Sequence, residues 1–193
     1  MKTGILLALF LLVGNQIFSQ KMITRTGEVK FEASMPAFEE IAASNKTTSC
    51  ILDKATGDFV ALTLIKSFKF KAPLMEEHFN ENYMESSLFP KATFKGKILN
   101  FDAKKLSAAK TAYDLEGDLT IHGVTKKIKT KINLTLNGAK ILATSAISVK
   151  PQDYKIEIPS LVKGKIAENV KVSMNFSLAV SYTHLTLPTI YSV

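Results

Sequence analysis

Apolar residues occupy every second position over much of this chain, and that alternation constrains the fold more than any other feature. Strict alternation over several residues is typical of β-strands with one buried face. A longer apolar run, Phe59–Phe70, predicts one further strand with both faces covered. The sequence therefore predicts an all-β protein of about eight strands. The alternating segments are 29–33, 48–52, 92–98, 113–121, 128–136, 141–149 and 170–178.

One segment departs from this pattern. Between residues 73 and 85, apolar residues recur three and four positions apart, which is typical of an amphipathic helix. Pro73 suits a first helical turn, and Glu76 follows where the helix dipole favours negative charge. A single helix is thus inserted among strands that favour a sandwich or a closed antiparallel barrel. An eight-stranded barrel is either filled by side chains or holds one ligand, and the pattern leaves both open.

The first 19 residues are typical of a secretory signal peptide. Lys2 precedes an apolar run from Ile5 to Val13, and Ser19 supplies a small residue at the expected cleavage site. The run is too short to span a hydrocarbon core of about 30 Å. We therefore expect an exported protein, periplasmic or secreted, with no transmembrane anchor and one domain over residues 20–179.

The opposite end has an unusual composition. Residues 180–193 carry no charged side chain and resemble the translated read-through of a sequencing adapter. We predict that this tail is not native and exclude it, with His184, from the functional residues. The alternative is a genuine last strand.

Charge argues against a nucleic-acid partner. The formal net charge is +8, but Arg25 is the only arginine and the lysines are scattered, as in the ladder Lys127, Lys129 and Lys131. Proteins that bind nucleic acid usually concentrate their basic charge on one face. Scattered lysines favour soluble outer strand faces, and they also allow a peripheral contact with anionic lipid surfaces.

A single cysteine excludes an internal disulfide. Cys50 is either buried or the link of a homodimer, and its alternation with Thr48 and Leu52 favours burial.

The stretch Gly117–Lys127 contains the only residues that suggest catalysis. His122 lies between Thr120 and Thr125, but no orienting carboxylate completes a recognised motif. The His-Gly corner between two alternating segments instead predicts a hairpin turn. His78 and His122 lack the partners of a zinc site, so we expect no metal and no cofactor.

An acidic ladder precedes the lysine ladder along the chain. Asp114, Glu116 and Asp118 alternate with apolar residues on one predicted strand. Calcium binding is one interpretation, and pairing with the lysines of the next strand is the simpler one.

Three ordered motifs carry a family resemblance. Residues 74–86, 89–96 and 117–126 closely resemble the YceI-like family, and the version His-Phe-Asn-Glu-Asn-Tyr-Met-Glu-Ser in 78–86 resembles its Bacteroidetes-type branch. The resemblance implies an extended eight-stranded antiparallel barrel, similar to lipocalins, with an apolar lumen. It also implies a long apolar ligand, such as a polyisoprenoid or an isoprenoid quinone.

The resemblance turns a set of apolar residues into candidate ligand contacts. From the residues alone they are either plain core or the wall of a lipid tunnel, and the resemblance favours a tunnel closed by the helix. We expect a non-catalytic carrier or sequestering protein. The alternatives are a packed envelope or stress module that binds a partner by its surface, and a hydrolase or isomerase that uses His122. The candidate lumen residues are Phe79, Tyr83, Met84, Phe94, Ile98, Leu119, Met174 and Phe176.

Overall fold

The computed structural model describes residues 21–35 and 40–181. The predicted leader, residues 1–19, lies outside these ranges, as do residues 182–193 of the predicted tail. Val180 is the last residue of a strand and pairs with Met22. No helix of the described part is both long enough and apolar enough to cross a membrane.

Strands dominate the described residues. In chain order the elements are β1 (Lys21–Ser34), β2 (Ala42–Asp53), β3 (Asp58–Leu64), η2 (Ile65–Ser67), β4 (Lys69–Phe70), α1 (Pro73–His78), η3 (Phe79–Tyr83), β5 (Lys91–Ile98), η4 (Ala103–Lys105), β6 (Thr111–Ile121), β7 (Val124–Asn137), β8 (Lys140–Val149), η5 (Pro151–Tyr154) and β9 (Ile166–Val180).

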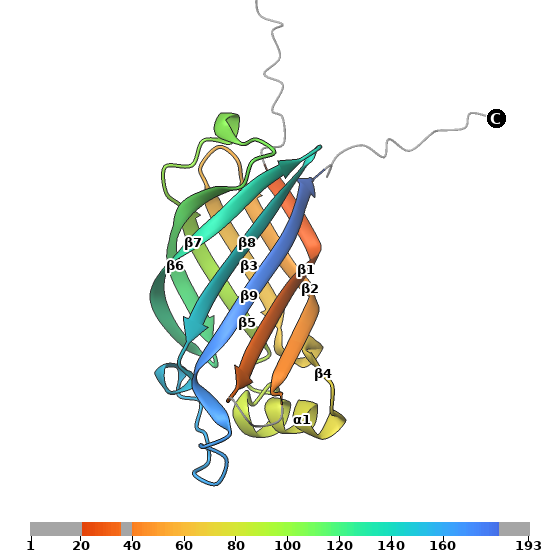
Figure 1. Cartoon of the computed structure of the whole chain (residues 1–193), viewed down its shortest axis with the longest axis vertical. Coiled ribbons are helices and arrows are strands. Elements are labelled where there is room, and N and C mark those ends of the chain that lie inside the picture. Colours follow the sequence, from red (N-terminus) through yellow and green to blue (C-terminus); the bar gives the residue numbers. More distant parts are fainter. Residues whose placement is uncertain (1–20, 36–39, 182–193) are drawn as a thin grey trace, which may run out of the picture.

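Eight of these strands close into an antiparallel barrel (Figure 1). Neighbours around the barrel follow the order β1, β9, β8, β7, β6, β5, β3 and β2, and the pairing of β1 with β2 closes it. The short β4 adds to the edge of β2. Closure pairs each barrel strand with a neighbour on both sides over part or all of its length, and the alternating residues then face either the lumen or the solvent. The predicted lipocalin-like barrel with one inserted helix is confirmed.

Turn chemistry sets the register of the longest hairpin. His122 and Gly123 join β6 to β7 with φ angles of 49° and 72°. Two consecutive residues with positive φ form the turn whose twist matches that of antiparallel strands. Glycine adopts this conformation freely, and histidine is among the residues that tolerate it. The predicted hairpin is therefore confirmed, and it places Thr120 opposite Thr125.

The barrel wall divides at one seam. β7 and β8 pair from Asn137↔Lys140 only as far as Ile132↔Ser145, and beyond that point their ladder stops. The η5 turn lies at this seam: its Tyr154 is buried, and its Asp153 forms an ion pair of 3.0 Å with Lys126 of β7. Pro151 and Tyr154 of this turn are buried, and a second cavity, of about 400 Å³, remains between β7, β8 and the turn.

Two predicted elements differ in detail. The expected helix over 73–85 is α-helical only to His78 and continues as a π-helical turn, in which the Met84 N–H donates to the Phe79 carbonyl. The expected strand Phe59–Phe70 ends at Leu64, and the prediction that both of its faces are covered is wrong, because Val60 and Leu64 are exposed. There the chain turns inward, so that Ile65 is buried, and η2 carries it to β4. The run of apolar residues in the sequence does not indicate where the strand leaves the barrel wall.

Candidate functional site

The half of the barrel nearest the termini is solidly packed. Its interior residues come from nearly every strand and are at most 2% exposed. Close packing of this kind leaves no room for a ligand. The residues that fill this half are Met22, Cys50, Leu52, Phe59, Ile98, Leu115, Ile132, Leu134, Ile141, Ala143 and Leu178.

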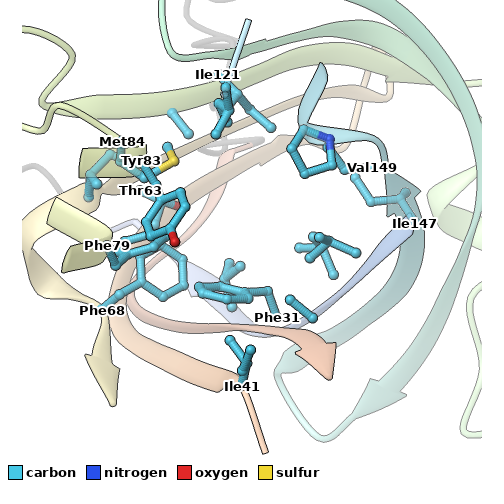
Figure 2. A pocket seen from close by; sticks show the side chains of 18 of the residues that line it. Phe31, Ile41, Thr63, Phe68, Phe79, Tyr83, Met84, Ile121, Ile147 and Val149 are labelled. Carbon is cyan, nitrogen blue, oxygen red and sulfur yellow. The ribbon is translucent and has the colours of Figure 1, made fainter. Parts of the chain in front are cut away.

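The other half is hollow. A cavity of about 510 Å³ lies between the strands and the helical segment, a size within the usual range of small-molecule sites of about 300–1,000 Å³. Figure 2 shows Phe68, Phe79 and Tyr83 on one side of it and Ile147 and Val149 across from them. The barrel is therefore neither filled throughout nor open throughout.

Polar groups on the cavity wall are few. The Thr63 hydroxyl is within 3.0 Å of the Thr48 hydroxyl, so it already has a partner. His78 and Lys165, which also line the cavity, belong to the helix and to the loop before β9. Both elements lie at the end of the barrel that the helix covers (Figure 1). A ligand would thus meet mainly hydrocarbon inside, apart from the hydroxyl-bearing side chains of Thr63, Thr93 and Tyr83, and ionisable groups near the mouth.

Residues 73–85, called the lid below, close the mouth through an aromatic cluster. Within α1 itself no residue is buried. Phe79, the first residue of the π-helical turn, stacks on Phe31 of β1 at a centroid distance of 5.3 Å and packs against Phe68 and Phe70 at 5.7 and 5.1 Å. Aromatic pairs at such distances contribute about 0.5–1.5 kcal/mol each beyond area burial. This ring is one anchor of the lid, and the ion pair of Glu76 with Lys69, at 2.6 Å, is another.

The π-helical turn explains how the lid faces the cavity. In an α-helix, residues three or four apart share a face, whereas hydrogen bonds five residues apart wind the chain more loosely. The looser turn brings Phe79, Tyr83 and Met84 to the same side, and all three line the cavity. An α-helix would turn Met84 away from Phe79.

Phenylalanine rings form the floor between the hollow and packed halves. Phe94 and Phe176 line the cavity and are 8% and 0% exposed. Below them lies Phe59, whose ring centroid is 6.3 Å from that of Phe94 and 6.1 Å from that of Phe176. Phe59 does not line the cavity. These three rings mark the depth at which the lumen ends.

Glycines make room for the floor rings. Gly96 and Gly117 face each other across β5 and β6, and a Cβ on either would lie 2.6 or 2.8 Å from Cζ of Phe94. Gly27 makes room for Phe176 in the same way, because a Cβ added to Gly27 would lie 2.3 Å from Cδ1 of Phe176. A glycine within a strand permits this close approach. The rings therefore lie in close contact with the glycine backbone.

Comparison with known proteins agrees with this architecture. A sequence model of the YceI-like domain matches residues 19–178. The chain belongs to the YceI-like family. No curated protein sequence matches it.

Solved structures share the fold of this YceI-like chain at low identity. A polyisoprenoid binding domain from Saccharophagus degradans, implicated in plant cell wall breakdown, is 17% identical with a TM-score of 0.72, covering 84% of this chain and 99% of that one. Burkholderia cenocepacia BcnA is 17% identical with a TM-score of 0.65, covering 79% and 96%. The Campylobacter jejuni YCEI protein is 16% identical with a TM-score of 0.57, covering 74% and 88%. At these identities the similarity shows the fold alone.

The structure brings most of the candidate lumen residues together. Ile98 is the exception: it is buried in the packed half, because β5 runs from the mouth toward that end. Ligand contact by these residues stays a prediction. The candidates that line the cavity of this YceI-like barrel are Phe79, Tyr83, Met84, Phe94, Leu119, Met174 and Phe176.

Sequence reasoning missed several wall residues. Phe31, Ile147, Val149 and Val172 line the cavity at the mouth half of three different strands. Their alternation marks them as inward-facing, which was visible in the sequence. The sequence does not show how far along the barrel axis each residue lies, because that position depends on how the strands are staggered.

His122 is tied to the structure through both ring nitrogens. Nε2 lies 2.8 Å from a Glu85 carboxylate oxygen and Nδ1 lies 3.3 Å from the Tyr154 carbonyl oxygen. The ring also packs on Phe89 at 4.3 Å. The Thr120 hydroxyl contacts Thr125, at 2.8 Å, rather than His122. This arrangement fastens the end of the lid and the η5 turn to the β6–β7 hairpin, and it contains no nucleophile–base pair.

The two charged ladders pair with each other. Lys129 lies 2.7 Å from Glu116 and Lys131 lies 2.5 Å from Asp114. The Glu116 carboxylate raises the pKa of Lys129. Among the described residues, no cluster of three or more His, Cys, Asp or Glu side chains could hold a metal ion. Cross-strand pairing, the simpler interpretation of the ladders, is confirmed for two of their three rungs; Asp118 lies opposite Lys127 but forms no ion pair with it.

Cys50 lies in the packed half and is 1% exposed. Burial raises the pKa of its thiol well above the usual range, because the apolar surroundings penalise the thiolate. The predicted burial is confirmed. A buried cysteine of this kind packs as a small core residue, and its thiol is chemically unreactive.

Proposed function

We propose that this protein binds one long apolar lipid, a polyisoprenoid, an isoprenoid quinone or a related chain, inside the barrel, and carries or sequesters it without chemical change. The observation that supports the proposal is the apolar cavity between the barrel strands and the lid. Each methylene buried there stabilises the complex by about 0.8 kcal/mol, so a chain can be held without a charged anchor. The related domain described as polyisoprenoid binding supports the same ligand class.

The ligand contacts in this proposal are the sequence-predicted residues that line the cavity. Phe79, Tyr83 and Met84 would cover the chain from the lid, while Met174 and Leu119 would contact it from the wall. The tight fixing of His122 in the hairpin favours binding over catalysis.

Native mass spectrometry of protein purified from its own host tests the proposal. We expect a co-purifying lipid that organic extraction removes. Val172→Trp, which places a large ring in the cavity, should abolish the bound mass. Ser173→Trp is the matched control, because Ser173 neighbours it on β9 but is exposed. Wild-type protein that carries no lipid and binds none on titration would refute the proposal.

Export and membrane contact complete this proposal. In this proposal residues 1–19 are a signal peptide, residues 20–179 form a periplasmic or secreted domain, and residues 180–193 are not native, although Val180 itself occupies the last position of β9 opposite Met22. Leu74, Leu88 and Leu161 are 61%, 71% and 90% exposed and belong to the lid and to loops at the mouth end. Exposed apolar side chains around a mouth favour a peripheral contact with a bilayer, through which a lipid would pass.

Vesicle flotation tests the membrane contact. Exchange of the three leucines for serine should reduce flotation with lipid vesicles. Exchange of Ile51, an exposed residue of the β2 wall, is the control and should leave flotation unchanged. Equal flotation of the leucine variant and wild type would contradict the contact. A homodimer stays a prediction, and the buried Cys50 does not support a disulfide-linked one.

A further inference from the structure

We propose that the phenylalanine floor acts as a ruler for chain length, so that the barrel encloses about 20 carbons of a single linear hydrocarbon chain and leaves any remainder outside the mouth. The inference rests on the proposed lipid binding and specifies which lipids are fully enclosed. The residues that set the limit are Phe94 and Phe176, with Phe59 beneath them.

The first argument is that the lumen does not continue below the floor. Phe59, Leu115 and Leu178 occupy the barrel centre beyond it, are at most 1% exposed and do not line the cavity. A chain could reach further only by displacing these side chains. Closely packed cores resist such insertion, at a cost of several buried contacts.

The second argument is that the floor rings cannot easily swing aside. Phe94 lies against the backbone of Gly96 and Gly117, and Phe176 lies against that of Gly27. Phe59 supports both rings from the packed side. A ring held by backbone on one side and by a buried ring below has no free volume on the packed side, so it cannot move downward to let a chain pass. The floor is therefore part of the barrel wall rather than a flexible gate.

Cavity volume sets the length. An apolar protein cavity of about 150 Å³ accommodates one benzene, which has six carbons. The cavity here is about 510 Å³, somewhat over three times larger. By this scale it holds about 20 carbons. A polyisoprenoid of twice that length would keep about half of its chain outside the barrel.

This geometry predicts a break in the dependence of affinity on chain length. Each methylene added within the cavity should tighten binding about fourfold. Beyond about 20 carbons the added methylenes stay in solvent, so affinity should stop rising. A tunnel through the barrel would show no such break.

Competition binding with linear primary alcohols tests the ruler. The alcohols would increase in steps of two carbons, displacing a fluorescent fatty-acid probe from the full-length barrel. Phe94→Ala removes a benzene-sized ring from the floor and should move the break to longer chains by up to about six carbons. Ala61→Leu is the opposite change: Ala61 lines the cavity beside Phe94, and three extra carbons should move the break about three carbons lower.

Phe101→Ala serves as the control. Phe101 packs against Tyr113 and does not line the cavity, so the same ring is lost without a change to the floor. Its break should match that of wild type. Affinity that keeps rising well beyond 20 carbons in wild type, or a break that Phe94→Ala and Ala61→Leu leave in place, would overturn the ruler and leave lipid binding intact. If no alcohol displaces the probe and no probe binds, the proposed function itself fails.

Discussion

The glycine pair beneath Phe94 makes a sharp prediction about stability. In Gly117→Ala, the new Cβ would lie 2.4 Å from Cα of Gly96 and 2.5 Å from the carbonyl oxygen of Lys95. Favourable contacts between carbon atoms are about 3.5–4.0 Å, so both approaches are too short by about 1 Å. Both neighbours are backbone atoms of the β5 ladder, which cannot rotate away. The strands must separate locally.

The expected cost follows from two opposing terms. Overpacking of a core typically costs about 1–3 kcal/mol. Replacing glycine by alanine recovers about 0.4–1 kcal/mol through the unfolded chain. The midpoints of these two ranges, about 2 and about 0.7 kcal/mol, give a net fall in the free energy of unfolding of about 1.3 kcal/mol for Gly117→Ala. For a domain of this size that corresponds to a fall in Tm of about 3–5 °C.

Urea and thermal unfolding followed by circular dichroism measure the effect. Gly164→Ala is the matched control, because a Cβ at Gly164 has no atom within 4 Å and its φ is not positive. The same exchange there should leave stability unchanged or raise it by up to about 1 kcal/mol. A Gly117→Ala protein as stable as wild type would refute the close approach of β5 and β6. Equal losses in both variants would show that the effect is not steric.

Two further predictions concern buried groups. Because burial raises the Cys50 pKa, its stabilising contribution is complete below the unfolded pKa of about 8.5 and is lost as pH rises above it. Between about pH 9 and 10, the free energy of unfolding of wild type should fall by about 1.4 kcal/mol per pH unit more than that of Cys50→Ala. Urea unfolding under reducing conditions measures this difference. Parallel pH profiles of the two proteins would contradict the prediction. His122→Asn should lower the free energy of unfolding by about 1–3 kcal/mol, because the Tyr154 carbonyl loses its hydrogen-bond partner. It should also speed amide hydrogen exchange in the lid, because the contact of Glu85 with His122 holds the end of the lid to the hairpin. Unchanged exchange in the lid would show that this contact does not hold it.

The sequence predicted the barrel well because its signals are local. Alternation marks inward residues on each strand, and the His122–Gly123 corner specifies its own turn by backbone conformation. The pairing of Glu116 with Lys129 also follows from hairpin register. Each of these features depends on residues close together in the chain.

The features that escaped prediction are non-local. The strand predicted to Phe70 ends at Leu64, because the barrel wall ends there and the chain must cross to β4. The π-helical turn at Phe79 is absent from the apolar pattern, which reads as an ordinary helix. Ile98 and Phe94 belong to one strand face, yet only Phe94 lines the cavity. Periodicity gives the face of a residue and says nothing of its depth.

The amino-acid sequence by itself determined the all-β class, the hairpins, the inserted helix and the motifs of the family. The tertiary structure decided where the lumen is open. That decision depends on Gly96 and Gly117, which are distant in the sequence and meet only when β5 pairs with β6. Because neither glycine has a side chain, the Phe94 ring can pack directly against the backbone at both positions. The barrel is hollow on the mouth side of that ring and filled on the other side. The stagger of closed strands fixes that depth, and no single segment of the chain encodes it.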